Sequence, residues 1–156
     1  MVTKNKMVLL MGEHEAIMAQ MKCMSDSLSS VVQQSDWRTT RLVEVKVQLW
    51  SCRLGLYDLR DGIRRHIERD EGIFAVLGGA SFEELTRQHK EICKEVDAAI
   101  SLADATLAKE LTAEEWKEYA LNIGAAVNRI CELKKAHTVT EDGLLETPNL
   151  SGQPFT

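Results

Sequence analysis

The sequence predicts an all-α protein that folds as an up-down-up-down four-helix bundle. Helix-forming residues dominate the 156-residue chain, which holds only nine glycines and two prolines, and long stretches lack both. Along four separate runs of the chain, apolar residues recur at alternating steps of three and four, the spacing of helices packed nearly antiparallel. A chain of this length has the size of one domain. We therefore expect residues 1–147 to form one bundle and residues 148–156 to form a C-terminal tail.

The first two predicted helices cover residues 4–33 and 36–77. The break between them falls at Ser35 and Asp36, whose side chains are favourable helix N-caps. The inward stripe of the first helix comprises Met7, Met11, His14, Met18, Met21 and Leu28. The stripe of the second comprises Leu42, Val45, Leu49, Cys52, Leu56, Leu59, Ile63, His66, Asp70, Ile73 and Leu77. The second stripe is thus apolar except at two adjacent positions, a His and an Asp.

The last two predicted helices start at capping boxes, which open at Ser81 and Thr112 and carry a Glu three residues later. Gly78 and Gly79 precede the first box and can end the helix before it. The helix over 81–109 has the inward stripe Phe82, Leu85, His89, Ile92, Val96, Ala99 and Ala103. The helix over 112–146 has the stripe Trp116, Tyr119, Ile123, Ala126, Ile130, Leu133, His137, Glu141 and Leu144. Each of the four predicted helices therefore places one histidine on its inner face.

The four stripes hold all four histidines of the chain and two carboxylates, Asp70 and Glu141. A single histidine on an apolar stripe is usually a core residue that hydrogen-bonds to a polar neighbour. One histidine on each of the four stripes instead indicates that the four side chains serve a common site. An ionised carboxylate buried without a positive partner costs several kcal/mol. No Lys or Arg falls on a stripe near either carboxylate, because Lys134 and Lys135 are expected on the solvated outer face. A metal ion is therefore predicted to supply the missing positive charge.

The six candidate ligands are His14, His66, Asp70, His89, His137 and Glu141. Those on the first and third helices lie about two turns after the helix start, and those on the other two lie about two to three turns before the helix end. These ends meet in an up-down bundle, so all six fall in one layer. A His and a carboxylate four residues apart can offer an imidazole to one metal and a bridging oxygen to a second. Such ligands suit iron, manganese or zinc.

This order of elements resembles the hemerythrin-like, HHE cation-binding domain family. Family members carry His on the first helix, His-x-x-x-Glu on the second, His on the third and His-x-x-x-Glu on the fourth, and the resemblance covers residues 5–147. It implies two non-haem iron ions, oxo- or hydroxo-bridged, on the six residues named above. The chain departs from the family at Asp70, where Glu is usual, and Glu71 is an alternative ligand. It also lacks the fifth histidine of the oxygen-carrying members, which argues against simple oxygen transport.

The resemblance implies a protein that senses, stores or buffers oxygen, nitric oxide or iron by reversible ligation. Two alternatives stay open. The same site can belong to an enzyme that decomposes peroxide or nitric oxide, or that delivers iron, and turnover of the ligand would distinguish it from a sensor. The bundle can instead be a metal-free interaction module, which predicts that no metal copurifies.

Charge and hydropathy indicate which classes of partner and which cellular location to expect. The net charge is −5 with both signs interspersed, which argues against a nucleic-acid surface. The apolar run over residues 7–11 is far too short to span a membrane, and a cytoplasmic location is expected. The four cysteines form no Cys-x-x-Cys pair and are expected to be free thiols. The sequence does not identify a protein partner.

Overall fold

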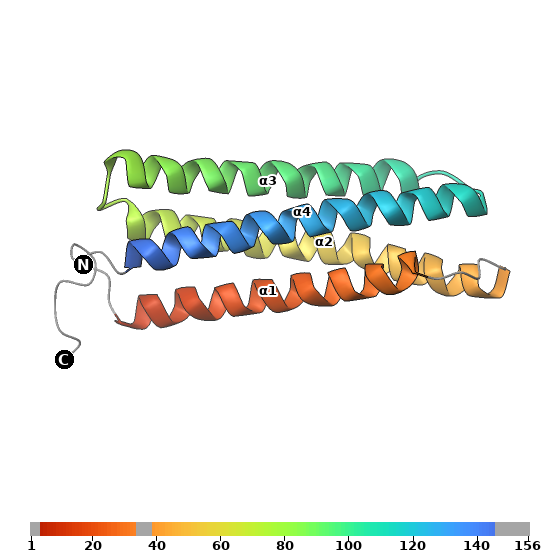
Figure 1. Cartoon of the computed structure of the whole chain (residues 1–156), viewed down its shortest axis with the longest axis horizontal. Coiled ribbons are helices and arrows are strands. Elements are labelled where there is room, and N and C mark those ends of the chain that lie inside the picture. The colour runs from red at the N-terminus through yellow and green to blue at the C-terminus, as the bar shows by residue number, and fades with distance from the viewer. Residues whose placement is uncertain (1–3, 34–38, 146–156) are drawn as a thin grey trace.

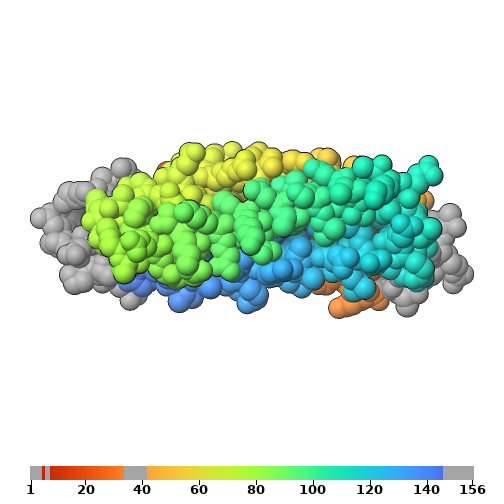
Figure 2. All heavy atoms as spheres, turned by 90° about the horizontal axis from the view of Figure 1, so that it is seen from above, coloured from red at the N-terminus to blue at the C-terminus, as the bar shows by residue number. Residues whose placement is uncertain are grey.

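The protein folds as four long helices arranged side by side (Figure 1). The computed structural model describes residues 4–33 and 39–145, and no strand occurs among them. The helices are α1 (Lys4–Val32), α2 (Thr39–Phe74), α3 (Gly79–Leu107) and α4 (Ala113–Leu145). Successive helices run in opposite directions, and α1 and α3 each pack against both α2 and α4. Figure 2 shows α3 lying between its two neighbours on one face of the bundle. The predicted fold class is confirmed.

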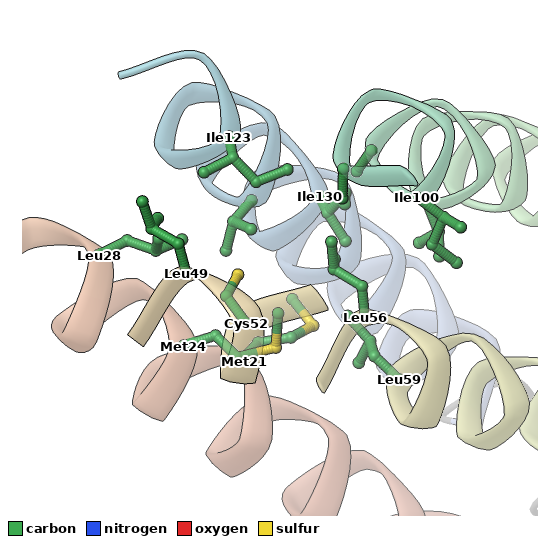
Figure 3. Close-up of a cluster of buried hydrophobic side chains, with 14 of the residues drawn as sticks. Met21, Met24, Leu28, Leu49, Cys52, Leu56, Leu59, Ile100, Ile123 and Ile130 are labelled. Atoms are coloured by element: carbon green, nitrogen blue, oxygen red, sulfur yellow. The ribbon is translucent and has the colours of Figure 1, made fainter. Parts of the chain in front are cut away.

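The apolar core follows the predicted stripes on α2 and α3. On α4, Val127 and Lys134 are buried where the prediction placed Ala126 and Leu133, which are half-buried. The buried members of the core on α2 are Val45, Leu49, Cys52, Leu56, Leu59, Ile63 and Ile73. Figure 3 shows Leu56 and Leu59 facing Ile100 of α3 and Ile130 of α4. Burying each such side chain contributes about 1.5–3 kcal/mol relative to leaving it in water. Apolar packing therefore holds the helices together over most of their length.

The inward stripe of α1 differs from the prediction by a rotation of about one residue. Met11 is 57% exposed, whereas Leu10 is 1% and Ile17 5% exposed. The observed stripe is Leu10, His14, Ile17, Met21, Met24, Leu28 and Val31. Apolar residues stand next to each other at positions 10–11 and 17–18, so the spacing alone fits either stripe. The side chain of Met7 lies outside the described part of the chain.

One predicted capping box forms and the other does not. Before α4, the Thr112 hydroxyl accepts from the Glu115 amide at 3.2 Å, and the Glu115 carboxylate accepts from the Thr112 amide at 3.2 Å. The helix α3 begins at Gly79, ahead of Ser81, and its N-cap residue Gly78 makes no side-chain cap. Gly78 and Gly79 have φ angles of 55° and 59°, which glycine adopts without the steric cost of a side chain. The chain therefore enters α3 through a tight turn at Gly78 and Gly79, without the side-chain cap that was predicted at Ser81.

Several other expectations concern the loops and the surface. The predicted break at Ser35 and Asp36 and the tail over 148–156 lie outside the described residues. The four cysteines are free, and only Cys23 is exposed. Among the described helices, none combines the length and the apolar character that a membrane span requires.

Replacing a buried and an exposed leucine of α2 in turn tests the packing of the bundle. Leu56 is 0% and Leu54 62% exposed on the same helix. We expect Leu56→Ala to lower the free energy of unfolding by about 2–5 kcal/mol because it leaves a cavity. The matched change Leu54→Ala should alter it by less than about 0.5 kcal/mol. Urea unfolding followed by circular dichroism measures both, and equal losses in the two variants would contradict the bundle packing.

Candidate metal centre

The structure brings all six predicted ligands into one layer of the bundle. Each helix contributes through its inner face: His14 from α1, His66 and Asp70 from α2, His89 from α3, and His137 and Glu141 from α4. The five on α2, α3 and α4 are at most 2% exposed, and the side chain of His14 is 12% exposed. This polar layer divides the apolar core into a small cluster around Leu10, Ile73, Phe74 and Leu85 and a large one along the rest of the bundle.

The four imidazoles form two close pairs. The rings of His14 and His66 have centroids 4.4 Å apart, and those of His89 and His137 are 4.5 Å apart. Between the pairs, the His66 and His137 centroids are 6.4 Å apart. One pair therefore comes from α1 and α2, and the other comes from α3 and α4.

The two carboxylates lie between these imidazoles. Asp70 Oδ2 is 2.8 Å from His89 Nε2 and 3.3 Å from His137 Nε2. Glu141 Oε1 is 3.2 Å from His137 Nε2 and 3.5 Å from His66 Nε2, and its second oxygen contacts His14 Nε2. Glu141 thus reaches both pairs, whereas Asp70 lies closer to the pair from α3 and α4, with His66 Nε2 at 4.0 Å.

A glutamine fixes the orientation of one imidazole. The Gln88 amide nitrogen donates to Thr140 Oγ1 at 2.9 Å and to Glu84 Oε1 at 3.1 Å, which fixes its amide orientation. Its carbonyl oxygen lies 3.0 Å from His137 Nδ1. An amide oxygen only accepts hydrogen bonds, so the Nδ1–H group of His137 donates to it. When this ring is neutral, the lone pair of Nε2 therefore points toward the centre of the layer.

The second ring of this pair is held in the same way by a carboxylate. Glu71 Oε1 is 3.0 Å from His89 Nδ1, and an ionised carboxylate likewise only accepts. The Glu71 side chain is 35% exposed, so it supports a ligand from the outside and does not replace Asp70. Metal-binding histidines commonly donate their outer N–H to such an acceptor.

Because both Nδ1 atoms donate outward, the inner Nε2 atoms of His89 and His137 face each other without a hydrogen between them when the rings are neutral. His89 Nε2 and His137 Nε2 are only 3.1 Å apart, and Asp70 Oδ2 lies close to both. If both rings are neutral, three lone pairs face each other in a buried site, which is repulsive. Only a cation, either a proton or a metal ion, relieves that repulsion.

Further polar atoms in this layer lack a hydrogen bond. Within the described part of the chain they include His66 Nε2, Asp70 Oδ1 and both carboxylate oxygens of Glu141. Buried polar atoms are normally hydrogen-bonded, and each exception needs an explanation. Ligand atoms of His66, Asp70, His137 and Glu141 lie within 4.8 Å of one another. The donor set and its spacing therefore fit a metal ion.

Charge interactions within the layer shift the pKa values of its members. Burial alone would raise the pKa of Glu141, but the imidazoles of His137, His14 and His66 outweigh burial and hold that pKa far below its usual range. Burial lowers the pKa of His66. Burial acts on His137 in the same direction, but there the neighbouring carboxylates of Asp70 and Glu141 together outweigh burial and raise the pKa. The layer thus favours an anionic Glu141 beside a neutral His66.

The structure contradicts one prediction about charge near the site. Lys134 is 2% exposed, whereas the sequence placed it on the outer face with Lys135, which is 60% exposed as expected. Position 134 continues the spacing of Ile130, His137 and Glu141, and the prediction chose Leu133 in its place. A buried lysine therefore lies near both carboxylates. The need for positive charge beside Asp70 and Glu141 is therefore not sufficient to predict a metal ion. The close approach of the His89 and His137 Nε2 atoms supports the metal ion instead.

Sequence reasoning also missed the outer supports of the ligands. Gln88 and Glu71 directly neighbour a predicted ligand in the chain, but each supports a histidine on another helix. Thr138 Oγ1 similarly lies 3.5 Å from His14 Nδ1 across α1 and α4. No sequence pattern marks such contacts, because they depend on how the helices are rotated against each other.

A scan against protein-family models and searches of the curated proteins and the solved structures found no match to this chain. Fold and site therefore define it: an all-helical four-helix bundle with a buried His/Asp/Glu group that can hold a metal ion.

The hydrogen bond from His137 to Gln88 should tune metal affinity. We expect Gln88→Leu to weaken zinc binding by about 10–100-fold, the usual effect of losing such an outer partner. Gln88→Glu keeps an acceptor oxygen and should bind zinc nearly as well as the natural protein. Gln20→Leu makes the same change at a half-buried glutamine that donates to the Gly55 carbonyl at 3.3 Å, and it is the control. Competition with a chromophoric chelator measures the affinities, and equal weakening in the two leucine variants would contradict the assigned support.

Proposed function

We propose that this chain is a hemerythrin-like, dinuclear metal-binding protein that carries non-haem iron and reversibly binds a small ligand such as oxygen or nitric oxide. In this role it senses, stores or buffers the ligand or the iron. One observation carries the metal part of the proposal: His89 Nε2 and His137 Nε2 face each other at 3.1 Å beside Asp70, with both outer nitrogens committed as donors. The family resemblance of the ligand order supports iron and the small ligand.

The two imidazole pairs give a natural division of ligands between two metal ions. His14 and His66 would hold one ion, and His89 and His137 the other. Glu141 contacts imidazoles of both pairs, so it is suited to link the two ions, and Asp70 favours the second. When bound, iron supplies reversible ligation of diatomic molecules and a ferrous–ferric couple.

The surrounding residues keep the site dry and its donors oriented. Apolar clusters lie on both sides of the layer, and water exclusion strengthens the electrostatic attraction between carboxylates and cations. Gln88 and Glu71 hold two of the rings with their Nε2 lone pairs inward. Four imidazoles and two carboxylates do not fill the coordination of two iron ions, which leaves room for an exogenous ligand.

Reversible binding and turnover distinguish the proposed function from an enzyme on the same site. A sensor or store releases its ligand unchanged, whereas an enzyme consumes peroxide or nitric oxide many times per site. Stopped-flow mixing of the reduced, iron-loaded protein with oxygen or nitric oxide, followed by removal of the gas, makes the comparison. We expect the spectrum to return to that of the reduced protein.

The first test is the metal content of protein purified from iron-supplied cells. We expect about two irons per chain, as four imidazoles and two carboxylates imply, with near-ultraviolet absorption from an oxo-bridged pair. Combining His66→Ala with His137→Ala removes one ligand from each pair and should abolish both signals. Mass spectrometry of the metals also distinguishes iron from manganese and zinc.

The control for this experiment is Ile123→Ala on α4. Ile123 is 0% exposed and belongs to the large apolar cluster, so the change should lower stability while iron content stays at the natural level. A colourless, metal-free natural protein that is as stable as the double variant would overturn the proposal and favour a metal-free interaction module.

A further inference from the structure

A second apolar stripe runs along α2 on the face that points away from the bundle. This outer stripe consists of Val43, Val47, Trp50 and Leu54, which follow each other at steps of four, three and four residues. Their side chains are between 43% and 62% exposed, whereas Leu49 among them is fully buried. In the described part of the chain, no other helix carries four exposed large apolar residues at this spacing. This part of α2 is therefore apolar on two opposite faces, and only one of them packs inside the bundle.

The spacing of the outer stripe indicates that its partner is another helix. Alternating steps of three and four form the seam along which two helices pack at a shallow crossing angle. Exposed polar residues, among them Gln48 and Ser51, lie beside the stripe. An exposed apolar patch with a polar rim is typical of an interaction site.

Trp50 is fixed in a way that suits the anchor of an interface. The central guanidinium carbon of Arg53 lies 5.6 Å from the centre of the Trp50 ring, which is within the range of a cation–π interaction. Arg53 Nε in turn donates to Asp104 Oδ1 of α3 at 2.6 Å. Tryptophan and arginine are enriched among the residues that dominate binding energy. A side chain that is already held in place loses less entropy on binding.

Opposite charges lie along the two edges of the outer stripe. Arg53 pairs with an aspartate of α3, and Lys46 and Arg60 lie seven residues before and after it, so the three cations share the edge next to α3. On the other edge, Asp58 lines a groove against α1 together with two further carboxylates and Arg65. The stripe therefore has a basic edge toward α3 and a mainly acidic edge toward α1.

The α2 helix of a second copy of this chain matches the apolar seam and its charges. In a parallel pair of helices, the basic edge of each copy faces the acidic edge of the other, and Arg53 lies near Asp58 of the partner subunit. An antiparallel pair would instead bring Lys46 close to Arg53 of the partner subunit, and like charges at this distance are unfavourable. The charges on the two edges therefore favour the parallel arrangement.

We propose that the chain forms a two-fold dimer in which the outer stripes of two α2 helices pack side by side in parallel. Each residue of the stripe then contacts its own copy, with the two Trp50 side chains near the middle. One pair of helices is a small interface, so the dissociation constant is in the micromolar range. The stripe ends about 18 Å before His66 along α2, so the dimer does not depend on the proposed metal centre.

Sedimentation equilibrium from low micromolar to millimolar protein tests the dimer. We expect Val47→Glu to raise its dissociation constant by at least about tenfold, because two-fold symmetry places the two introduced carboxylates against each other. The matched control is Leu121→Glu on α4, since Leu121 is 56% and Val47 61% exposed, and it should leave the dissociation constant unchanged. Circular dichroism checks that both variants keep the helix content of the natural protein.

Disulfide cross-linking tests the parallel arrangement. Cys23 is exposed, so the experiment uses a Cys23→Ser background with diamide as the oxidant. Leu54→Cys should cross-link the two copies, because each Leu54 meets its own copy in a parallel pair. In an antiparallel pair Leu54 lies opposite Val43, and the two copies of position 54 are about 16 Å apart along the helix axes. Leu121→Cys in the same background is the control and should remain uncross-linked.

Each outcome supports or overturns the proposal. A natural protein that stays monomeric up to millimolar concentration would overturn the dimer and assign the outer stripe to a helix of a different protein. A dimer that Val47→Glu leaves intact would place the interface on another face. A dimer that depends on Val47 but gives no cross-link with Leu54→Cys would overturn the parallel arrangement. Weakening by Val47→Glu alone, together with the Leu54→Cys cross-link, would support the proposal.

Discussion

The close approach of two imidazole nitrogens and a carboxylate oxygen in a dry layer is the constraint on which the site depends. His89 Nε2, His137 Nε2 and Asp70 Oδ2 lie within 3.3 Å of one another. Such a cluster is unfavourable without a cation, so the apolar packing on both sides must hold the four helices at this depth. The two apolar clusters, one on each side of the layer, provide that rigidity.

The two imidazole pairs are not equivalent. In the pair from α3 and α4, both outer nitrogens donate to fixed acceptors, the Glu71 carboxylate and the Gln88 amide oxygen. In the other pair, His66 Nδ1 is buried without a hydrogen-bond partner among the described residues, and His14 is more exposed. A carboxylate acceptor makes its histidine a stronger donor to metal. The pair from α3 and α4 is therefore the better organised half of the centre.

Charge in this layer is balanced by more than the ligands. Asp70 and Glu141 are fully buried carboxylates, and Lys134 is a buried lysine on the same helix as Glu141. At the edge, the Arg69 guanidinium forms an ion pair with the Glu13 carboxylate. Counting charges on the predicted stripes was insufficient because the prediction placed Leu133, and not Lys134, on the inner face of α4. The structure buries the lysine instead.

The sequence by itself determined the helices, the inner faces of α2 and α3, most of the inner face of α4, and the six residues that meet in one layer. Those features follow from local periodicity, capping and distance along each helix, all of which are properties of a single segment. Only the tertiary structure decided which of two neighbouring apolar residues on α1 faces inward, how the histidines pair, that Gln88 supports a histidine and that Lys134 is buried. These depend on the rotation of each helix about its axis, which contacts with other helices fix and which one segment does not contain.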